Sequence, residues 1–287
     1  MERPWYRTKR VIAMATAMLM LAMASGCNLK DPVVHVGSPS PLASESAAPE
    51  ATAVPETPSP SQRTPHQTEA PDDAKPTEAN GAGAYTITAN TSESQKTYHS
   101  EHPDENALRV ENGANAKLDG SVIEKRKGDA SSLVDTLTHG LNAAVLTRGG
   151  AKLELLNSEI LSSPLGAGGA LACGGEITFD GGNIRTTGDG SFGLGATSGG
   201  SISAREMNIS VQGSNASVIR ASDGGSISLK GGIVSSGGKN APLLDASGTI
   251  LAESVTLRAS ESPAAMVNAG GSVSLTDCAV SGRMGDV

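Results

Sequence analysis

Apolar and polar residues alternate in short runs along the second half of the chain, and these runs recur at a nearly constant interval. A small residue precedes each run and serves as the marker of one repeat. The markers are Ala114, Ala151, Gly175, Gly200, Gly225, Gly248 and Gly271. Their spacings are 37, 24, 25, 25, 23 and 23 residues. A repeat of 23 to 25 residues with an internal period of two predicts one turn of a parallel β-helix.

Three positions of the repeat are apolar in every copy. Two residues after the marker stand Ala116, Leu153, Ile177, Ile202, Ile227, Ile250 and Val273. Four residues after it stand Leu118, Leu155, Phe179, Ala204, Leu229, Ala252 and Leu275. Nine residues after it stand Ile123, Ile160, Ile184, Ile209, Val234, Leu257 and Val280. Because alternate side chains of a strand face opposite sides, the first two columns belong to one inward-facing strand and the third to the next strand.

A third strand per turn is predicted four residues before the marker. Its column contains Val110, Leu171, Ala196, Ala221, Leu244 and Val267, with Thr147 as the exception. Gly-Gly pairs between the runs supply backbone conformations for the bends. The fold class is therefore all-β, a single-stranded right-handed parallel β-helix of about seven turns over residues 85–287. Each turn buries its inward face against its neighbours, as in other solenoids.

The longest spacing between markers reveals an insertion around Gly128 to Gly140. It contains Leu133, Val134 and Leu137, and we expect a loop or short helix that projects from one bend. Insertions in repeat proteins often carry the binding function, and equally often such a loop covers the open end of the rod.

The N-terminal segment has the pattern of an export signal. Basic residues precede an uncharged run from Val11 to Ala24, which is too short for a stable membrane-spanning helix. The sequence Ala24-Ser25-Gly26-Cys27 that follows resembles the lipobox of bacterial lipoproteins. The resemblance implies removal of residues 1–26 and lipidation of Cys27, which would anchor the protein to a membrane.

Residues 27–84 are predicted to be a disordered linker. Ten of the fifteen prolines lie between Asn28 and Ala84, among many Ser, Thr and Ala residues and almost no large apolar side chains. Such a composition buries too little surface to offset its ordering entropy. A long stalk after a lipidated cysteine is similar to the arrangement of Gram-positive surface lipoproteins, although a Gram-negative envelope also fits.

Composition excludes several classes of function. Aromatic residues make up 2% of the chain and the formal net charge is −8, so neither base stacking nor a basic footprint for nucleic acid is expected. Three cysteines exclude a disulfide framework. Cys173 and Cys278 fall four turns apart, too far for a disulfide, and are expected to be small buried residues.

A more specific resemblance lies at the start of the repeats. The segments Asp104 to Leu108 and Gly140 to Leu146, followed by turns flanked by Gly-Gly, resemble bacterial cell-surface right-handed β-helix repeat proteins of the adhesin-like type. That family implies a fold more firmly than a function.

Few residues point to chemistry. Five residues after the marker stand Asp180, Arg205, Lys230 and Glu253, and we expect the outer pairs Asp180–Arg205 and Lys230–Glu253 to form ion pairs. The segment His99 to His102, followed by Asp104 and Glu105, offers residue types that bind metals, but it is expected to cap the N-terminal end instead. No catalytic residue, cofactor site or metal site is predicted.

A hydroxyl array faces outward on the last four predicted turns. It consists of Ser201, Ser203, Ser226, Ser228, Thr249, Ser272 and Ser274, with Leu251 interrupting it. Such a face suits either a glycan or plain solvation.

Three functions remain open from the sequence. The first is a surface-anchored, non-enzymatic, adhesion-like binding protein whose ligand is a glycan or extracellular matrix. The second is a β-helical polysaccharide lyase or glycosidase, and the third is a structural envelope component. The final turn precedes Gly285 to Val287 without a capping helix, which leaves strand edges unpaired and predicts either a truncated gene product or end-to-end self-association.

Overall fold

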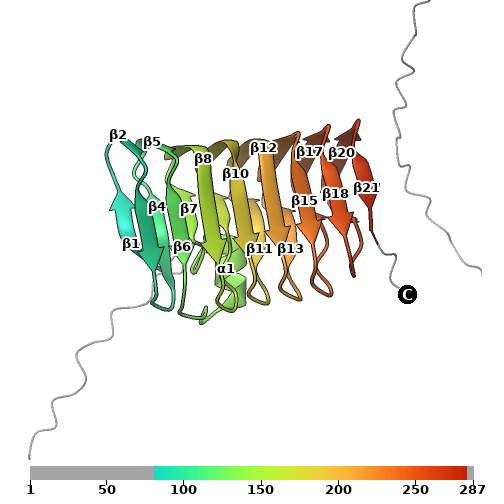
Figure 1. The fold of residues 1–287 in the computed structure, drawn as a ribbon, viewed down its shortest axis with the longest axis horizontal. Helices are drawn as coiled ribbons and strands as arrows, with labels where there is room; N and C mark the ends of the chain where they lie inside the picture. The colour runs from blue at the N-terminus through green and yellow to red at the C-terminus, as the bar shows by residue number, and fades with distance from the viewer. Residues whose placement is uncertain (1–80, 283–287) are drawn as a thin grey trace, which may run out of the picture. The chain divides into compact units, whose positions relative to one another are not determined.

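The structure is a computed structural model, and it describes residues 81–282. The predicted signal peptide, the predicted lipidation site Cys27, almost all of the predicted linker and residues 283–287 lie outside the described residues. Within the described range the chain forms a parallel β-solenoid of about eight turns (Figure 1). The predicted fold class is thus confirmed.

Two parallel sheets run along the solenoid. The eight-stranded sheet contains β1 (Ala82–Ile87), β4 (Glu105–Val110), β7 (Val145–Arg148), β9 (Ala170–Cys173), β11 (Phe192–Thr197), β13 (Ser217–Ala221), β16 (Leu244–Ala246) and β19 (Ala265–Val267). The main path of the thirteen-stranded sheet contains β2 (Thr91–Ser94), β5 (Asn115–Asp119), β8 (Lys152–Ser162), β10 (Glu176–Thr186), β12 (Ser201–Val211), β14 (Ser226–Lys230), β17 (Thr249–Glu253) and β20 (Ser272–Thr276). Its remaining strands are β3 (Thr97–Ser100), β6 (Val122–Lys125), β15 (Ile233–Ser236), β18 (Thr256–Ala259) and β21 (Ala279–Ser281).

The predicted inward columns are the core of the solenoid. Ile177 pairs in register with Ile202, and Ile202 pairs with Ile227, so the three side chains form one file. Each is at most 2% exposed. Because every turn presents the same residue type at the same place, each turn buries the inner face of its neighbour.

Glycine is required at the bend between the strand that starts just after the marker and the strand segment that follows it in the same turn. Gly182 has φ 113° and Gly232 has φ 84°, in the left-handed region that favours glycine. A Cβ atom on either residue would lie 2.2 Å from a carbonyl oxygen of the preceding turn. The expected role of the Gly-Gly pairs is therefore met at these two bends.

The structure has about eight turns where the sequence predicts about seven, because one more turn precedes the first marker. Strands β1, β2 and β3 form this N-terminal turn, and the solenoid begins at Ala82 rather than at residue 85. Thr91 and Glu93 occupy the two positions that are apolar elsewhere, since they pair with Ala116 and Leu118. In the part of the chain that the structure describes, no turn lies on the N-terminal side of these residues, so polar side chains are tolerated there.

The predicted column of the third strand is wrong at Leu171 and Leu244. Thr147 pairs with Ala172, and Ala221 pairs with Ala246, so the inward file contains these alanines. The bend between this strand and the marker varies in length, which shifts the file by one or two residues.

The insertion forms a short helix, α1 (Leu133–His139), as expected. The Ser132 side chain caps its first turn by accepting a hydrogen bond from the Asp135 N–H at 3.1 Å, and Gly140 ends it with φ 78°. An apolar cluster beneath the helix contains Leu137, Ala143, Leu146, Leu171, Phe192 and Cys173. The helix therefore covers the outer side of β7, β9 and β11, not the open end of the rod.

The C-terminal turn leaves its inward side uncovered by the described residues. Val267, Leu275 and Val280 are 41–54% exposed, although their counterparts in the preceding turns are buried. Cys278 belongs to this turn and is half-buried. Cys173 is half-buried as well, so the two thiols are free as predicted but not fully buried.

Candidate functional site

The first outer face is the outward side of β5, of the N-terminal halves of β8, β10 and β12, and of β14, β17 and β20. Four ion pairs cross from one turn to the next on it, and two were predicted, namely Asp180–Arg205 and Lys230–Glu253. The Arg205 Nε donates to Asp180 Oδ1 at 3.1 Å, and the Lys230 Nζ lies 3.2 Å from Glu253 Oε1. The other two pairs are Lys117–Glu154 at 3.0 Å and Lys152–Glu176 at 2.8 Å.

Sequence reasoning missed these last two pairs because it searched a single column of the repeat. Lys117 and Glu154 stand three residues after their markers and pair in register. Lys152 and Glu176 stand one residue after theirs and also pair in register. A comparison of every outward column would have found both.

Eight charged side chains of this face compensate one another in the four ion pairs, whereas Asp119 at the end of β5 accepts a hydrogen bond from the Asn157 amide at 3.5 Å. Hydrogen bonding from Arg205 and its positive charge lower the pKa of Asp180, and the same contact raises the pKa of Arg205. Asp180 therefore stays ionised over a wide pH range, with its carboxylate engaged by a guanidinium. A general acid for glycoside cleavage requires the opposite, a carboxyl group whose pKa is raised.

Three shallow recesses lie along the first outer face. The serine recess, of about 220 Å³, is lined by Ser201, Ser203, Ser226, Ser228, Thr249 and Leu251. A recess of about 300 Å³ surrounds the Lys117–Glu154 and Lys152–Glu176 pairs, and one of about 370 Å³ surrounds Asp180 and Arg205. The predicted hydroxyl array thus lies in one continuous strip with the ion pairs, and Leu251 adds an aliphatic side chain that is 48% exposed.

The second outer face is the outward side of β6, of the C-terminal halves of β8, β10 and β12, and of β15 and β18. The arginine recess, of about 380 Å³, opens on it and is lined by Glu159, Asn183, Arg185, Asn208, Ser210 and Ile233, among others. The Asn208 Nδ2 donates to Asn183 Oδ1 at 3.3 Å across adjacent turns. The sequence analysis singled out none of these residues.

The residues considered for metal binding near the N-terminus have separate partners. Glu101 pairs with Lys127 at 2.9 Å, which lowers the pKa of Glu101. Asp104 Oδ1 accepts a hydrogen bond from the Ser131 N–H, and Glu105 accepts one from the Ser100 hydroxyl at 2.7 Å. Within residues 81–282, no group of three or more His, Cys, Asp or Glu side chains is placed to hold a metal ion.

The N-terminal end contains a buried amine. The Lys125 Nζ donates to the Ser100 hydroxyl at 3.2 Å and to the His102 carbonyl oxygen. Lys125 is 1% exposed, and burial lowers its pKa to about 8. Tyr98, on the same strand as Ser100, donates a hydrogen bond to the Glu93 carboxylate. Burial together with this hydrogen bond raises the pKa of Tyr98.

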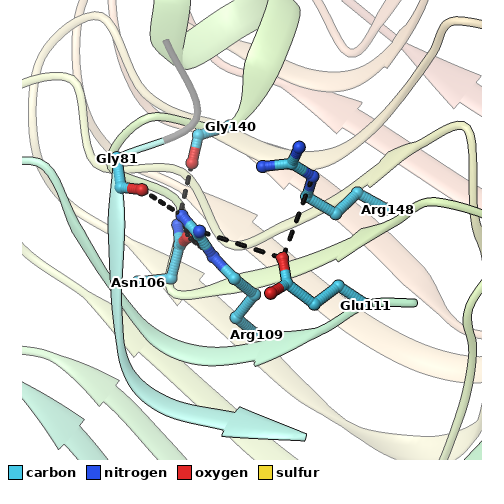
Figure 2. A network of polar contacts seen from close by, with 6 residues as sticks. All are labelled: Gly81, Asn106, Arg109, Glu111, Gly140 and Arg148. Atoms are coloured by element: carbon cyan, nitrogen blue, oxygen red, sulfur yellow. Dashed lines mark hydrogen bonds and ion pairs between the residues drawn. The ribbon is translucent and has the colours of Figure 1, made fainter. Parts of the chain in front are cut away.

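A second buried polar network ties the insertion to the sheet (Figure 2). The Asn106 amide donates to the carbonyl oxygens of Gly140 and Ala143, both at 2.8 Å, and Arg109 donates to the Gly81 carbonyl oxygen at 2.5 Å. Glu111 lies 4.0 Å from Arg109 and 3.9 Å from Arg148. These contacts hold the start of the solenoid and the end of the insertion against β4, so the network is structural.

No protein-family model, curated protein or solved structure shows significant similarity to this chain. Among the described residues, none of the helical structure is long and apolar enough to cross a membrane.

Proposed function

We propose that the chain is a surface-anchored, adhesion-like binding protein whose rod binds carbohydrate without cleaving it. The lipidated Cys27 anchors it, residues 27–84 carry the rod away from the membrane, and the ligand is an envelope, host or matrix glycan. The observation that carries the proposal is the first outer face, a strip of hydroxyl groups and compensated ion pairs with three recesses of about 220–370 Å³.

The chemistry of this strip suits sugars. Hydroxyl groups act both as donors and as acceptors, which matches the hydroxyl groups of a sugar. Turns repeat about every 4.8 Å along the rod, so an extended glycan lying along the axis meets the same groups at each turn. The paired charges leave no strong net field for an ionic ligand, which favours an uncharged glycan here.

The absence of catalysis is part of the proposal, and the state of Asp180 supports it. This carboxylate is held by Arg205, and the lowered pKa of Asp180 keeps it from donating a proton near neutral pH. A lyase or glycosidase would need another acid or base on this strip. Glu154, Glu176 and Glu253 each lie within 3.2 Å of a lysine, and Asp119 accepts a hydrogen bond from the Asn157 amide at 3.5 Å.

The proposal assigns a lesser part to the insertion. Val134 of α1 is 69% exposed and Leu133 is 42% exposed, so the helix presents apolar atoms to solvent beside the rod. Deleting residues 128–140 would also uncover Leu146, Leu171 and Phe192. The substitution Val134→Glu changes the exposed side chain alone, and unchanged attachment of cells that display this variant would remove the insertion from the binding surface.

A blocking substitution tests the binding strip. Ser228→Arg places a long side chain in the serine recess, whereas Ser281→Arg places the same side chain at an exposed position of β21, outside the first outer face. On a glycan array, we expect the native chain and Ser281→Arg to bind the same glycans and Ser228→Arg to lose most of the signal. Equal binding by all three proteins would contradict the proposal.

A further inference from the structure

The second outer face differs from the first in how its charges are arranged. On the first face, four pairs of opposite charge join adjacent turns. On the second, Arg185 is exposed and has no hydrogen-bond or ion-pair partner among residues 81–282. Arg126, at the edge of the same face, is neutralised by Glu124, to which its Nε donates at 2.8 Å. The Arg185 guanidinium is thus uncompensated within this part of the chain and lines the arginine recess.

Arg185 stands at a recess that holds further hydrogen-bonding groups. Asn183 lies two residues before it on β10, about 7 Å away along the strand, and Asn208 lies beside Asn183 on the next turn. The bond between the two carboxamides uses the Asn183 oxygen and one Asn208 hydrogen. The Asn183 amino group and the Asn208 carbonyl oxygen therefore remain available to a ligand.

One side of the recess is lined by an apolar side chain. Ile233 follows Asn208 in register on β15, and its side chain is 41% exposed. An exposed isoleucine beside carboxamides fits the C–H face of a sugar ring, whose edge carries the hydroxyl groups. Glu159 occupies the opposite side, in register with Asn183.

We propose that the arginine recess binds an acidic saccharide, one that carries a carboxylate on the ring. The carboxylate pairs with the Arg185 guanidinium, whose planar fork of donors matches two carboxylate oxygens. The ring hydroxyls bond to Asn183 and Asn208, and the ring face packs on Ile233. Glu159 repels the carboxylate from the other side and so sets the orientation of the sugar.

This ligand is different from that of the first outer face. There a neutral glycan fits because the four ion pairs already compensate their own charges, whereas the free guanidinium selects for negative charge. The overall net charge of −8 disfavours unspecific attraction of a polyanion, so binding of an acidic glycan must come from a local site.

The test compares two arginines of one column. Arg185 and Arg258 occupy the same column of the second outer face, three turns apart, through the register Arg185–Ser210–Ser235–Arg258. Only Arg185 lines the recess. The probes are tetragalacturonate, tetramannuronate and a hyaluronan tetrasaccharide, each with its methyl ester, and binding to the full chain is measured by calorimetry.

We expect at least one free acid to bind and its ester to bind about tenfold more weakly or worse, since a charge-assisted pair contributes at least that factor. Arg185→Gln should lose the same factor, and Asn183→Ala a smaller one, while Arg258→Gln should bind as the native chain does. Failure of all three acids to bind, or equal losses in Arg185→Gln and Arg258→Gln, would overturn the proposal. Ser228→Arg should leave the binding of acidic sugars unchanged, which separates this site from the serine recess.

Discussion

Thr147 pairs in register with Ala172 inside the solenoid, and within residues 81–282 the Thr147 hydroxyl has no hydrogen-bond partner. The residue is fully buried in a file that is otherwise apolar, next to Val110 in the preceding turn. A hydroxyl group desolvated in this way costs free energy that an isosteric methyl group would not.

Thr147→Val should therefore raise the free energy of unfolding by about 1 kcal/mol. Chemical denaturation of the native chain and the variant measures the difference. Thr178→Val on the outward side of β10 is the control, and it should change stability little because its side chain is not fully buried. A loss of stability in Thr147→Val would mean that the buried hydroxyl does have a partner.

The sequence predicts most of the core residues, because the inward positions two, four and nine residues after each marker keep a constant spacing in every turn that has a marker. Ile177, Ile202 and Ile227 are found where the alternation places them. The errors at Leu171 and Leu244 arise where a bend changes length, which a fixed offset cannot follow. The sequence pattern did not predict the N-terminal turn, because Glu93 occupies a position that is apolar in the other turns.

The candidate sites were less predictable than the fold. Two of the four ion pairs on the first outer face were predicted, from a column in which charges of opposite sign follow one another. A comparison of the column of Arg185 would have set it apart from Arg205, because the in-register neighbours of Arg185 are the uncharged Leu161 and Ser210. Lys125 did leave a signal, because it stands two residues after the inward Ile123, at a position where alternation predicts burial.

Burial of Lys125 predicts a specific dependence of stability on pH. Its pKa is about 8 in the folded chain and 10.5 ordinarily, so between these values the unfolded chain binds a proton that the folded chain has released. The free energy of unfolding should therefore rise as pH increases from 8 to 10.5, relative to a chain without this amine. After allowance for solvent screening, the gain is about 1–2 kcal/mol.

Lys125→Met supplies that reference, since it keeps the length of the side chain and removes the charge. Thermal unfolding of both proteins across this pH interval measures the difference, and the native chain should gain on the variant as pH rises. Parallel curves would show that Lys125 keeps its ordinary pKa when folded.

The exposed C-terminal turn predicts self-association. The inward side chains of Leu275 and Val280 are 41% and 48% exposed because no further turn covers them within residues 81–282, and the edges of β19, β20 and β21 on that side are unpaired there. Unpaired strand edges with apolar side chains favour contact with a second copy. Sedimentation of the full chain should show an apparent mass that increases with concentration.

Leu275→Glu should reduce this association by placing a charge at the contact. Leu251→Glu is the matched control, because Leu251 is similarly exposed, at 48%, but lies on the first outer face within the row of turns. A native chain that sediments as a monomer at every concentration would exclude association through the C-terminal turn.

Binding without cleavage is the central claim, and one measurement tests both halves of it. Glycans that the array identifies are incubated with the native chain and with Asp180→Ala, the bound fraction is determined, and the recovered oligosaccharides are analysed by mass spectrometry. The account predicts that the native chain retains the glycan and that both proteins return it at its original length. Shortened or unsaturated products from the native chain, lost in Asp180→Ala, would contradict the account and favour a polysaccharide-degrading enzyme.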